Sequence, residues 1–204
     1  MTPYLRDPAQ IYRRSFEIIR AETDFSRLPA DAEEVATRVI HACGMPEIVQ
    51  DLRISLDFVG AAKAALAAGR PVLVDAEMVR HGIIDKQLNV ICTLNDPQAR
   101  NIGLATGNTR SAAAVELWRP HLEGAVAVIG NAPTALFALL EMIDAGAPKP
   151  AAIVGFPVGI VGAAESKDEL AANPRGIAYA TLLGRRGGSA MAASVVNALM
   201  RGAQ

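Results

Sequence analysis

The residue best suited to acid–base chemistry is a histidine in a predicted helix. On a helical projection of residues 31–43 the apolar side chains form one stripe, and His41 falls roughly opposite the centre of that stripe. An imidazole titrates near neutral pH, so a histidine on the polar face can serve as a proton donor. The pattern alone favours a solvated side chain, because imidazolium suits the carboxyl end of a helix.

The other histidines and the two cysteines do not have the spacing of a metal site. His81 lies at a predicted helix end, which indicates a structural role, and His121 lies in a predicted surface turn. Cys43 and Cys92 each lie in an apolar pattern, and no H-x-x-x-H or carboxylate cluster accompanies them. We therefore expect no metal and no cofactor.

Three Gly-rich junctions, at residues 125–136, 151–167 and 178–192, each lead from a strand-like apolar run into a helical pattern. In an open α/β sheet such junctions lie at the carboxyl ends of the strands, where ligands bind. Any one basic or hydroxyl side chain there also fits a surface ion pair or a helix cap. The candidates are Lys167, Arg186 and Ser189 in these junctions, Arg110 and Ser111 at another helix start, and Arg13, Arg14 and Ser15 on the first predicted helix.

The junctions lack the signatures of several other enzyme classes. Residues 129–135 do not have the G-x-G-x-x-G spacing of a dinucleotide site, and residues 184–190 lack the Walker lysine. No G-x-S-x-G elbow of a hydrolase occurs. Gly155, Gly159 and Gly162 allow either close helix–sheet packing or close approach of a ligand.

The elements that position these residues alternate between strand and helix after residue 70. Short apolar runs of strand length lie at 71–76, 89–94, 125–130, 151–156 and 177–183. Helical patterns at 77–84, 109–118, 132–146, 162–172 and 187–201 separate most of them. This alternation indicates a five-stranded parallel sheet covered on both faces. Residues 1–70 predict three helices, the third over 55–69, without an obvious place in that sheet.

Several helix ends carry capping signals. Asp7-Pro8 predicts the start of the first helix, and Gly44 predicts the end of the second. Further caps are expected from Asp31 paired with Glu34 and from Asn131 before Pro133. Asp75 at a strand end either orients a donor or caps the helix that follows it, and we favour the cap.

Composition narrows the partner classes. The 204 residues are 51% hydrophobic and only 4% aromatic, and the net charge of −1 provides no basic field for nucleic acid. No signal peptide or membrane-spanning stretch is evident, and two cysteines in apolar surroundings suggest a reducing compartment. We expect one cytoplasmic domain with neither nucleic acid nor membrane as partner.

Ordered motifs along the chain resemble the precorrin-8X methylmutases of corrin-ring (cobalamin) biosynthesis. They are Ile129-Gly-Asn-Ala-Pro-Thr-Ala-Leu-Phe137, Pro157-Val-Gly-Ile-Val-Gly-Ala-Ala-Glu-Ser-Lys167 and Gly184-Arg-Arg-Gly-Gly-Ser189, together with Thr109-Arg-Ser-Ala112 and Arg38-Val-Ile-His41. The resemblance implies a flavodoxin-like three-layer α/β/α sandwich with extra N-terminal helices. It further implies a single methylmutase domain over 1–204, with a helical part at 1–70 and a β/α core at 71–204. A homodimer with the pocket near its interface is also implied.

The same resemblance implies a reaction. A methyl group moves from carbon 11 to carbon 12 of ring C in precorrin-8X, giving hydrogenobyrinic acid or, from the cobalt-containing substrate, its cobalt analogue. Nothing is oxidised, no methyl donor is consumed and no cofactor is needed. A suprafacial 1,5 shift becomes easier when the conjugated ring is protonated, and the family carries its essential histidine in this helix. His41 is therefore the expected catalytic acid.

The implied substrate also gives the basic residues a role. The periphery of a precorrin carries acetate and propionate carboxylates, which the planar fork of arginine meets bidentately. We rank Arg110, Lys167 and Arg186 ahead of Arg13 and Arg14 as anchors, and add Ser15, Ser111, Gly159 and Ser189 as further substrate contacts.

Three classes of function are compatible with these residues. The first is the isomerase, and the second is a corrinoid carrier of the same pathway without turnover. The third is a hydrolase, or a Schiff-base enzyme that uses Lys167, although no base is evident beside a nucleophile. A histidine on the polar helix face favours the isomerase, because a carrier has no need of a proton donor.

Overall fold

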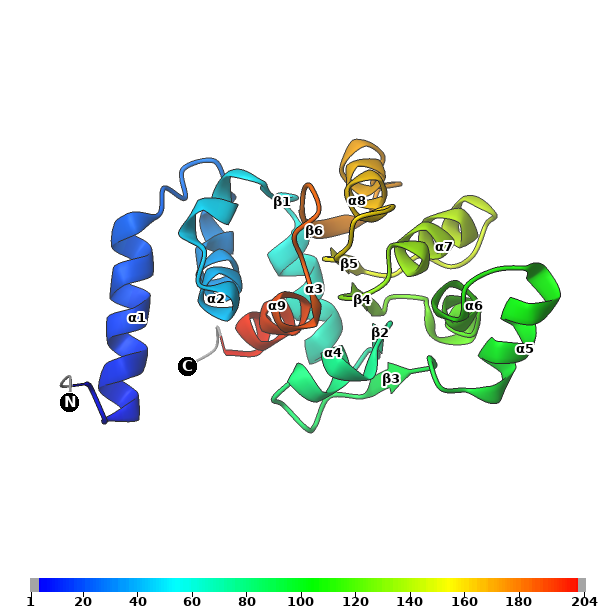
Figure 1. The fold of residues 1–204 in the computed structure, drawn as a ribbon, viewed down its shortest axis with the longest axis horizontal. Helices are drawn as coiled ribbons and strands as arrows, with labels where there is room; N and C mark the ends of the chain where they lie inside the picture. The colour runs from blue at the N-terminus through cyan, green and yellow to red at the C-terminus, as the bar shows by residue number, and fades with distance from the viewer. Residues whose placement is uncertain (1–3, 202–204) are drawn as a thin grey trace.

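The computed structural model describes residues 4–201, which form a six-stranded sheet with helices on both faces (Figure 1). The strand order is β1-β6-β5-β4-β2-β3, and every neighbouring pair is parallel except β1 with β6. The strands are β1 (Leu52–Ile54), β2 (Val72–Val74), β3 (Val90–Cys92), β4 (Val126–Ile129), β5 (Ala152–Gly155) and β6 (Ala178–Leu182).

The five predicted strands are confirmed. The predicted count of five is wrong, because the sheet has a sixth strand, β1, at one edge. That strand has the sequence Leu52-Arg53-Ile54, in which a charged residue interrupts the apolar run that made the equally short β2 and β3 recognisable. The five parallel strands have the order β3-β2-β4-β5-β6, which is the order of flavodoxin-like folds. The predicted fold class is therefore confirmed, with an antiparallel strand added at one edge.

Alternate residues of each strand face opposite helical layers. Val72 and Val74 belong to the buried cluster formed with α3, α4 and α9, whereas Leu73 between them belongs to the cluster formed with α6, α7 and α8. The helices after residue 50 are α3 (Phe58–Ala67), α4 (Glu77–Gly82), α5 (Pro97–Thr106), α6 (Arg110–Glu116), α7 (Pro133–Asp144), α8 (Ala163–Ala172) and α9 (Ser189–Arg201).

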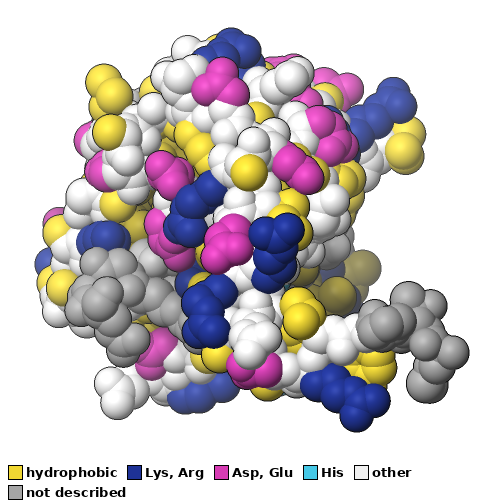
Figure 2. Space-filling model, turned by 90° about the vertical axis from the view of Figure 1, so that its left-hand side faces the viewer, with side chains coloured by type: hydrophobic (Ala, Val, Ile, Leu, Met, Phe, Trp, Pro, Cys, Tyr) yellow, Lys and Arg dark blue, Asp and Glu magenta, His cyan; other side chains and the backbone are white. Residues whose placement is uncertain are grey.

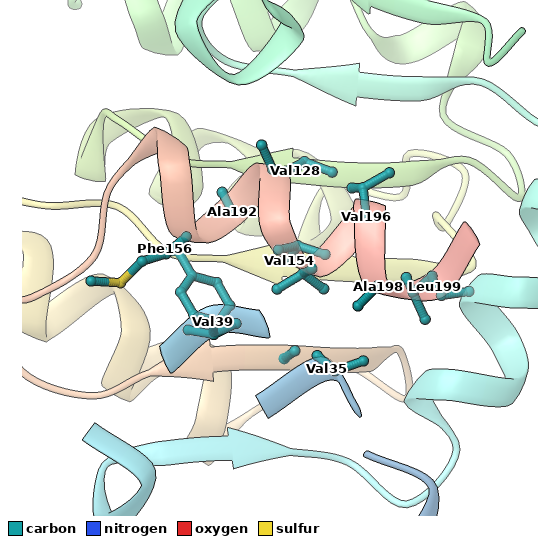
Figure 3. Close-up of a cluster of buried hydrophobic side chains, with 14 of the residues drawn as sticks. Val35, Val39, Val128, Val154, Phe156, Ala192, Val196, Ala198 and Leu199 are labelled. Carbon is teal, nitrogen blue, oxygen red and sulfur yellow. The ribbon is translucent and has the colours of Figure 1, made fainter. Parts of the chain in front are cut away.

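The two N-terminal helices extend one side of this sandwich. Helix α2 (Glu33–Cys43) packs on α9, and α1 (Pro8–Glu22) packs on α2, so α1 is the outermost helix of that end in Figure 1. The surface on that side carries basic and acidic side chains interspersed with apolar ones, as Figure 2 shows. Figure 3 shows Val35 and Val39 of α2 in the buried cluster that also contains Val196 and Leu199 of α9.

Helix starts agree with the capping signals at some positions and differ at others. The Asp7 carboxylate accepts the Ala9 N–H at 3.0 Å, and Gly44 ends α2 in the left-handed conformation, as predicted. The paired cap of Asp31 and Glu34 is wrong, because residues 30–32 form a 3-10 turn and no side chain caps α2. The cap by Asn131 is also wrong: Ala132 holds that position, with Pro133 next.

Helix α5 lies in a segment for which no helix was predicted. Its start repeats the Asp-Pro signal seen at the first helix, since Asp96 accepts the Gln98 N–H at 2.8 Å and Pro97 opens the helix. Within residues 4–201 no helix is long and apolar enough to cross a membrane.

Candidate functional site

The loops that follow β5 and β6 lie side by side at the carboxyl end of the sheet. The Gly188 N–H donates to the Phe156 carbonyl at 2.8 Å, and the Gly159 N–H donates to the Arg185 carbonyl at 3.3 Å. A Cβ on Gly187 would lie 2.5 Å from the Phe156 carbonyl oxygen, so only glycine fits this close approach. The Val158 N–H also donates to the Asn131 carbonyl at 3.3 Å, so the structure brings all three predicted Gly-rich junctions into contact.

The carboxyl end of β2 carries Asp75, whose side chain is buried. Its carboxylate accepts the N–H groups of Gly130, Asn131 and Ala132 at 2.8, 3.0 and 2.8 Å. The expectation that Asp75 caps the following helix is therefore wrong, because it binds the junction after β4 instead. Burial raises the pKa of this carboxyl group, and the three N–H groups act in the opposite direction.

This contact lies where the strand order reverses, between β2 and β4. Doubly wound folds bind ligands in that crevice, usually with free backbone N–H groups. Here the N–H groups of residues 130–132 already serve the Asp75 carboxylate. Those three N–H groups are therefore not free to bind a ligand.

His41 lies two residues before the end of α2, and its side chain is exposed. Its ring is 5.2 Å from the Phe16 ring and 6.2 Å from the Tyr12 ring, measured between centroids. Those two rings stack on each other at 4.3 Å, and the Arg38 guanidinium lies over both and donates to the Tyr12 hydroxyl. Helix α1 therefore supplies an aromatic wall beside the imidazole.

An open groove of about 340 Å³ lies between α1 and the end of α2, with His41 in its lining. Three isoleucines give the groove an apolar part, which suits a partly apolar ligand. It is lined by Ser15, Ile18, Ile19, Glu22, Ile40, His41, Gly44 and Pro46. Of the predicted site residues, the groove thus joins His41 with Ser15.

Lys167 and Arg186 lie at the contact between the β5 and β6 loops. The Lys167 side chain is fully buried and donates from Nζ to the Arg186 carbonyl at 2.5 Å. Burial lowers the pKa of Lys167 to about 8. The Arg186 guanidinium donates to Glu47 at 3.1 Å and to Asp51 at 2.9 Å, so both predicted anchors have internal partners.

A family model described as "CbiC: Precorrin-8X methylmutase" matches residues 10–202. The chain belongs to the precorrin-8X methylmutase family. It is 60% identical to the precorrin-8X methylmutase of Pseudomonas aeruginosa, over 98% of each chain. It is 34% identical to the cobalt-precorrin-8 methylmutase of Methanothermobacter thermautotrophicus, over 94% of this chain and 91% of that one.

Solved structures agree with this membership. The precorrin-8x methyl mutase of Thermus thermophilus matches with a TM-score of 0.84 and 34% identity, and 95% of each chain is covered. The predicted family and the predicted isomerase activity are confirmed, and the carrier is not favoured.

The remaining predicted contacts of the methylmutase lie in three places. Gly159 has φ of 155° in the loop after β5, and the Ser189 hydroxyl lies 3.5 Å from the Gly130 carbonyl at the start of α9. Arg110 is exposed at the start of α6 and lines a second open groove with Arg100 and Asn95, while Ser111 beside it is half-buried.

Arg13 and Arg14 are both exposed on α1, the helix that also carries Ser15. Arg14 lies 3.5 Å from Glu17 in an exposed pair, which contributes little to stability. Both guanidinium groups are therefore available to a ligand at the surface of the methylmutase.

The other histidines of the methylmutase have the structural settings expected of them. The His81 ring lies 2.8 Å from the Glu77 carbonyl at the end of α4, and His121 is exposed in a 3-10 turn. Among the described residues no group of three potential ligands could hold a metal ion.

Tyr12 and Phe16, whose rings lie beside His41, were not among the predicted site residues. Their spacing of four places both rings on one face of α1, and this spacing was the available signal. The partner helix of that face could not be read from the pattern, because α1 and α2 are joined by a turn of irregular conformation.

Proposed function

We propose that this protein moves the methyl group from carbon 11 to carbon 12 of precorrin-8X and so forms hydrogenobyrinic acid. The observation that carries the proposal is His41, exposed beside an aromatic wall and a partly apolar groove in a member of the methylmutase family. The relative at 60% identity is named for precorrin-8X, and the one at 34% for cobalt-precorrin-8, which favours the metal-free substrate.

His41 serves as the acid in this proposal. Protonation of, or a hydrogen bond to, a ring nitrogen withdraws electron density from the conjugated system and makes carbon 12 a better acceptor of the methyl group. The proton returns to the imidazole when the product forms, so the reaction consumes nothing. Acid catalysis of this kind contributes about 10²–10⁴-fold in rate.

The substrate carboxylates need several separated donors. Ser15 lies in the His41 groove, and Arg13 and Arg14 lie on the same helix. Gly159 and Ser189 offer backbone and hydroxyl groups at the strand ends, while Arg110 and Ser111 lie further along that edge. We propose these residues as substrate contacts; the contacts of Lys167 and Arg186 indicate a different role, argued below.

The proposal includes a cytoplasmic homodimer with the pocket near its interface. The loop after β5 supports an interface there, because Val158, Ile160 and Val161 expose 43%, 73% and 87% of their surface. Exposed aliphatic side chains grouped on one loop are typical of association surfaces. The net charge of −1 again argues against nucleic acid as a partner.

The amount of substrate converted per protein molecule distinguishes an enzyme from a carrier that only binds. Purified protein at one-hundredth of the concentration of metal-free precorrin-8X should convert all of it, seen as a change of the visible spectrum. A carrier would stop the spectral change at one equivalent of protein. Trapping of a borohydride-reduced adduct on Lys167 would instead support the Schiff-base enzyme.

A further inference from the structure

Arg186 is held from two sides by contacts within the chain. Its backbone carbonyl accepts the hydrogen bond from the buried Lys167 on α8 at 2.5 Å. Its guanidinium donates to Oε1 of Glu47 at 3.1 Å and to Oδ2 of Asp51 at 2.9 Å. One residue of the 183–188 loop thus joins α8 to the segment that contains the two acids.

That segment directly follows the helix of His41. Helix α2 ends at Cys43, Gly44 closes it, and the 3-10 turn Pro46–Gln50 leads to Asp51. The main chain reinforces the contact, because the Leu183 N–H donates to the Asp51 carbonyl at 3.0 Å. A line of contacts therefore runs from α8 through the 183–188 loop to the carboxyl end of α2.

The geometry points to Lys167 and Arg186 as positioning residues, which hold segment 44–51 against the 183–188 loop and so fix His41 relative to the carboxyl ends of β5 and β6. The inference rests on the proposed function, in which His41 is the acid. Anchoring of a substrate carboxylate would require Lys167 to reach solvent, and at Arg186 the substrate would share a guanidinium that already binds two acids.

Burial of Lys167 is consistent with this role. An ammonium group removed from water and given one carbonyl partner gains little stability over an apolar side chain of equal volume. Stability is therefore not the chief effect of the contact. What the contact does provide is a fixed position for the Arg186 carbonyl, and a displacement of about 1 Å at a reacting group can cost about 10²-fold in rate.

The decisive variant removes both acids, Glu47→Gln with Asp51→Asn. Their side chains are 59% and 45% exposed, so the fold should tolerate the change. A positioning role predicts a kcat about three- to tenfold lower with KM and product affinity unchanged. A carboxylate-binding role predicts the opposite: Arg186 is released, kcat is retained, and KM is equal or lower. That second result would overturn the inference.

The matched control is a second arginine that binds two acids. Arg175 contacts Asp144 at 2.7 Å and Glu169 at 2.8 Å, near the amino ends of β5 and β6. Asp144→Asn with Glu169→Gln makes the same change of charge and should leave kcat within twofold of wild type. Adding Arg186→Ala to the Glu47→Gln, Asp51→Asn protein should lower kcat by less than Arg186→Ala alone does, because the charge-assisted part of the contact is already lost.

Lys167→Met tests the contact between α8 and the 183–188 loop. We expect kcat to fall about 10- to 100-fold with KM unchanged, whereas a rise in KM at constant kcat would identify Lys167 as a substrate contact. The activity of the wild-type protein distinguishes failure of the proposed function from failure of the positioning role. If it does not turn over precorrin-8X, the proposed function fails. If it does, and both the Glu47→Gln, Asp51→Asn protein and the Lys167→Met protein match it, only the positioning role fails.

Discussion

The imidazole of His41 differs from the two other histidines in what surrounds it. It lies 5.2 Å from the Phe16 ring at the edge of a groove, whereas His81 contacts the backbone of its own helix. The Phe16 and Tyr12 rings lie beside the imidazole, and His41 is still exposed. The residue type was predicted to be catalytic, and the wall gives that prediction a physical setting.

The buried ammonium of Lys167 predicts a particular dependence of stability on pH. Its folded-state pKa of about 8 lies below the ordinary value for lysine of about 10.4, so between these values the unfolded chain binds more protons than the folded chain. The free energy of unfolding contributed by this residue should therefore rise with pH across that window, by about 1–3 kcal/mol.

Urea unfolding of wild type and Lys167→Met at pH 7 and pH 10 measures this contribution. Methionine has a similar length and no charge, so the variant lacks the proton-linked term while most other groups are shared. We expect wild type to gain stability relative to the variant at the higher pH. Equal pH dependence of the two proteins would show that the ammonium is not desolvated in the folded state.

At the scale of elements, apolar runs predicted the parallel strands, and two elements were missed. All five parallel strands were found because each lies in an apolar run between helices. β1 was missed because Arg53 interrupts its three residues, and α5 was missed although Asp96-Pro97 signals its start. Local patterns report local structure, so the edge strand needed its long-range partner β6 to be recognised.

For the candidate site, too, local features could be predicted from the sequence and long-range contacts could not. The junctions after β5 and β6 were located by their glycines, and their mutual contact follows from the sheet topology. The partners of Arg186 lie 139 and 135 residues away in sequence, and no spacing rule connects such positions. The sequence thus located the charged side chains, but it could not show whether each of them binds a ligand or another part of the chain.

The contact between the two junctions predicts a strong effect of one methyl group. In Gly187→Ala the new Cβ would lie 2.5 Å from the carbonyl oxygens of both Phe156 and Pro157, so the 183–188 loop must move. We expect a loss of about 1–3 kcal/mol in unfolding free energy, together with lower kcat.

Gly60→Ala is the control for that substitution. Gly60 lies within α3, and a Cβ there would meet no atom within 4 Å. Because alanine is the better helix former, this variant should gain about 0.5–1 kcal/mol. A Gly187→Ala protein as stable and active as Gly60→Ala would mean that the two loops are not held in close contact.

At the scale of the whole molecule, the predicted substrate contacts in the loops after β5 and β6 all lie at the carboxyl end of the sheet. α1 and α2 form a further layer outside α9 on one face of the sheet, with α2 anchored on α9 (Figure 1). The two N-terminal helices that had no obvious place in a five-stranded sandwich therefore carry the proposed acid His41 and the aromatic rings beside it. Their further part in a subunit interface belongs to the proposed homodimer.

The proposed dimer predicts an effect of charge on the loop after β5. Ile160→Glu with Val161→Glu places two charges on exposed aliphatic positions and should shift the protein from dimer to monomer in sedimentation velocity. Leu56→Glu, at a residue that is 85% exposed elsewhere, should leave the dimer intact. A wild-type monomer, or a dimer unaffected by the paired charges, would contradict this interface.

The central claim is that His41 is the acid of a methyl migration, and the rate of that migration tests it most directly. We would follow conversion of metal-free precorrin-8X by its visible spectrum, with mass spectrometry to show that substrate and product have equal mass, for wild type, His41→Ala and His81→Ala. The account predicts turnover by wild type and His81→Ala, and a kcat about 10²–10⁴-fold lower for His41→Ala with product still bound. A His41→Ala protein that turns over at the wild-type rate would contradict it.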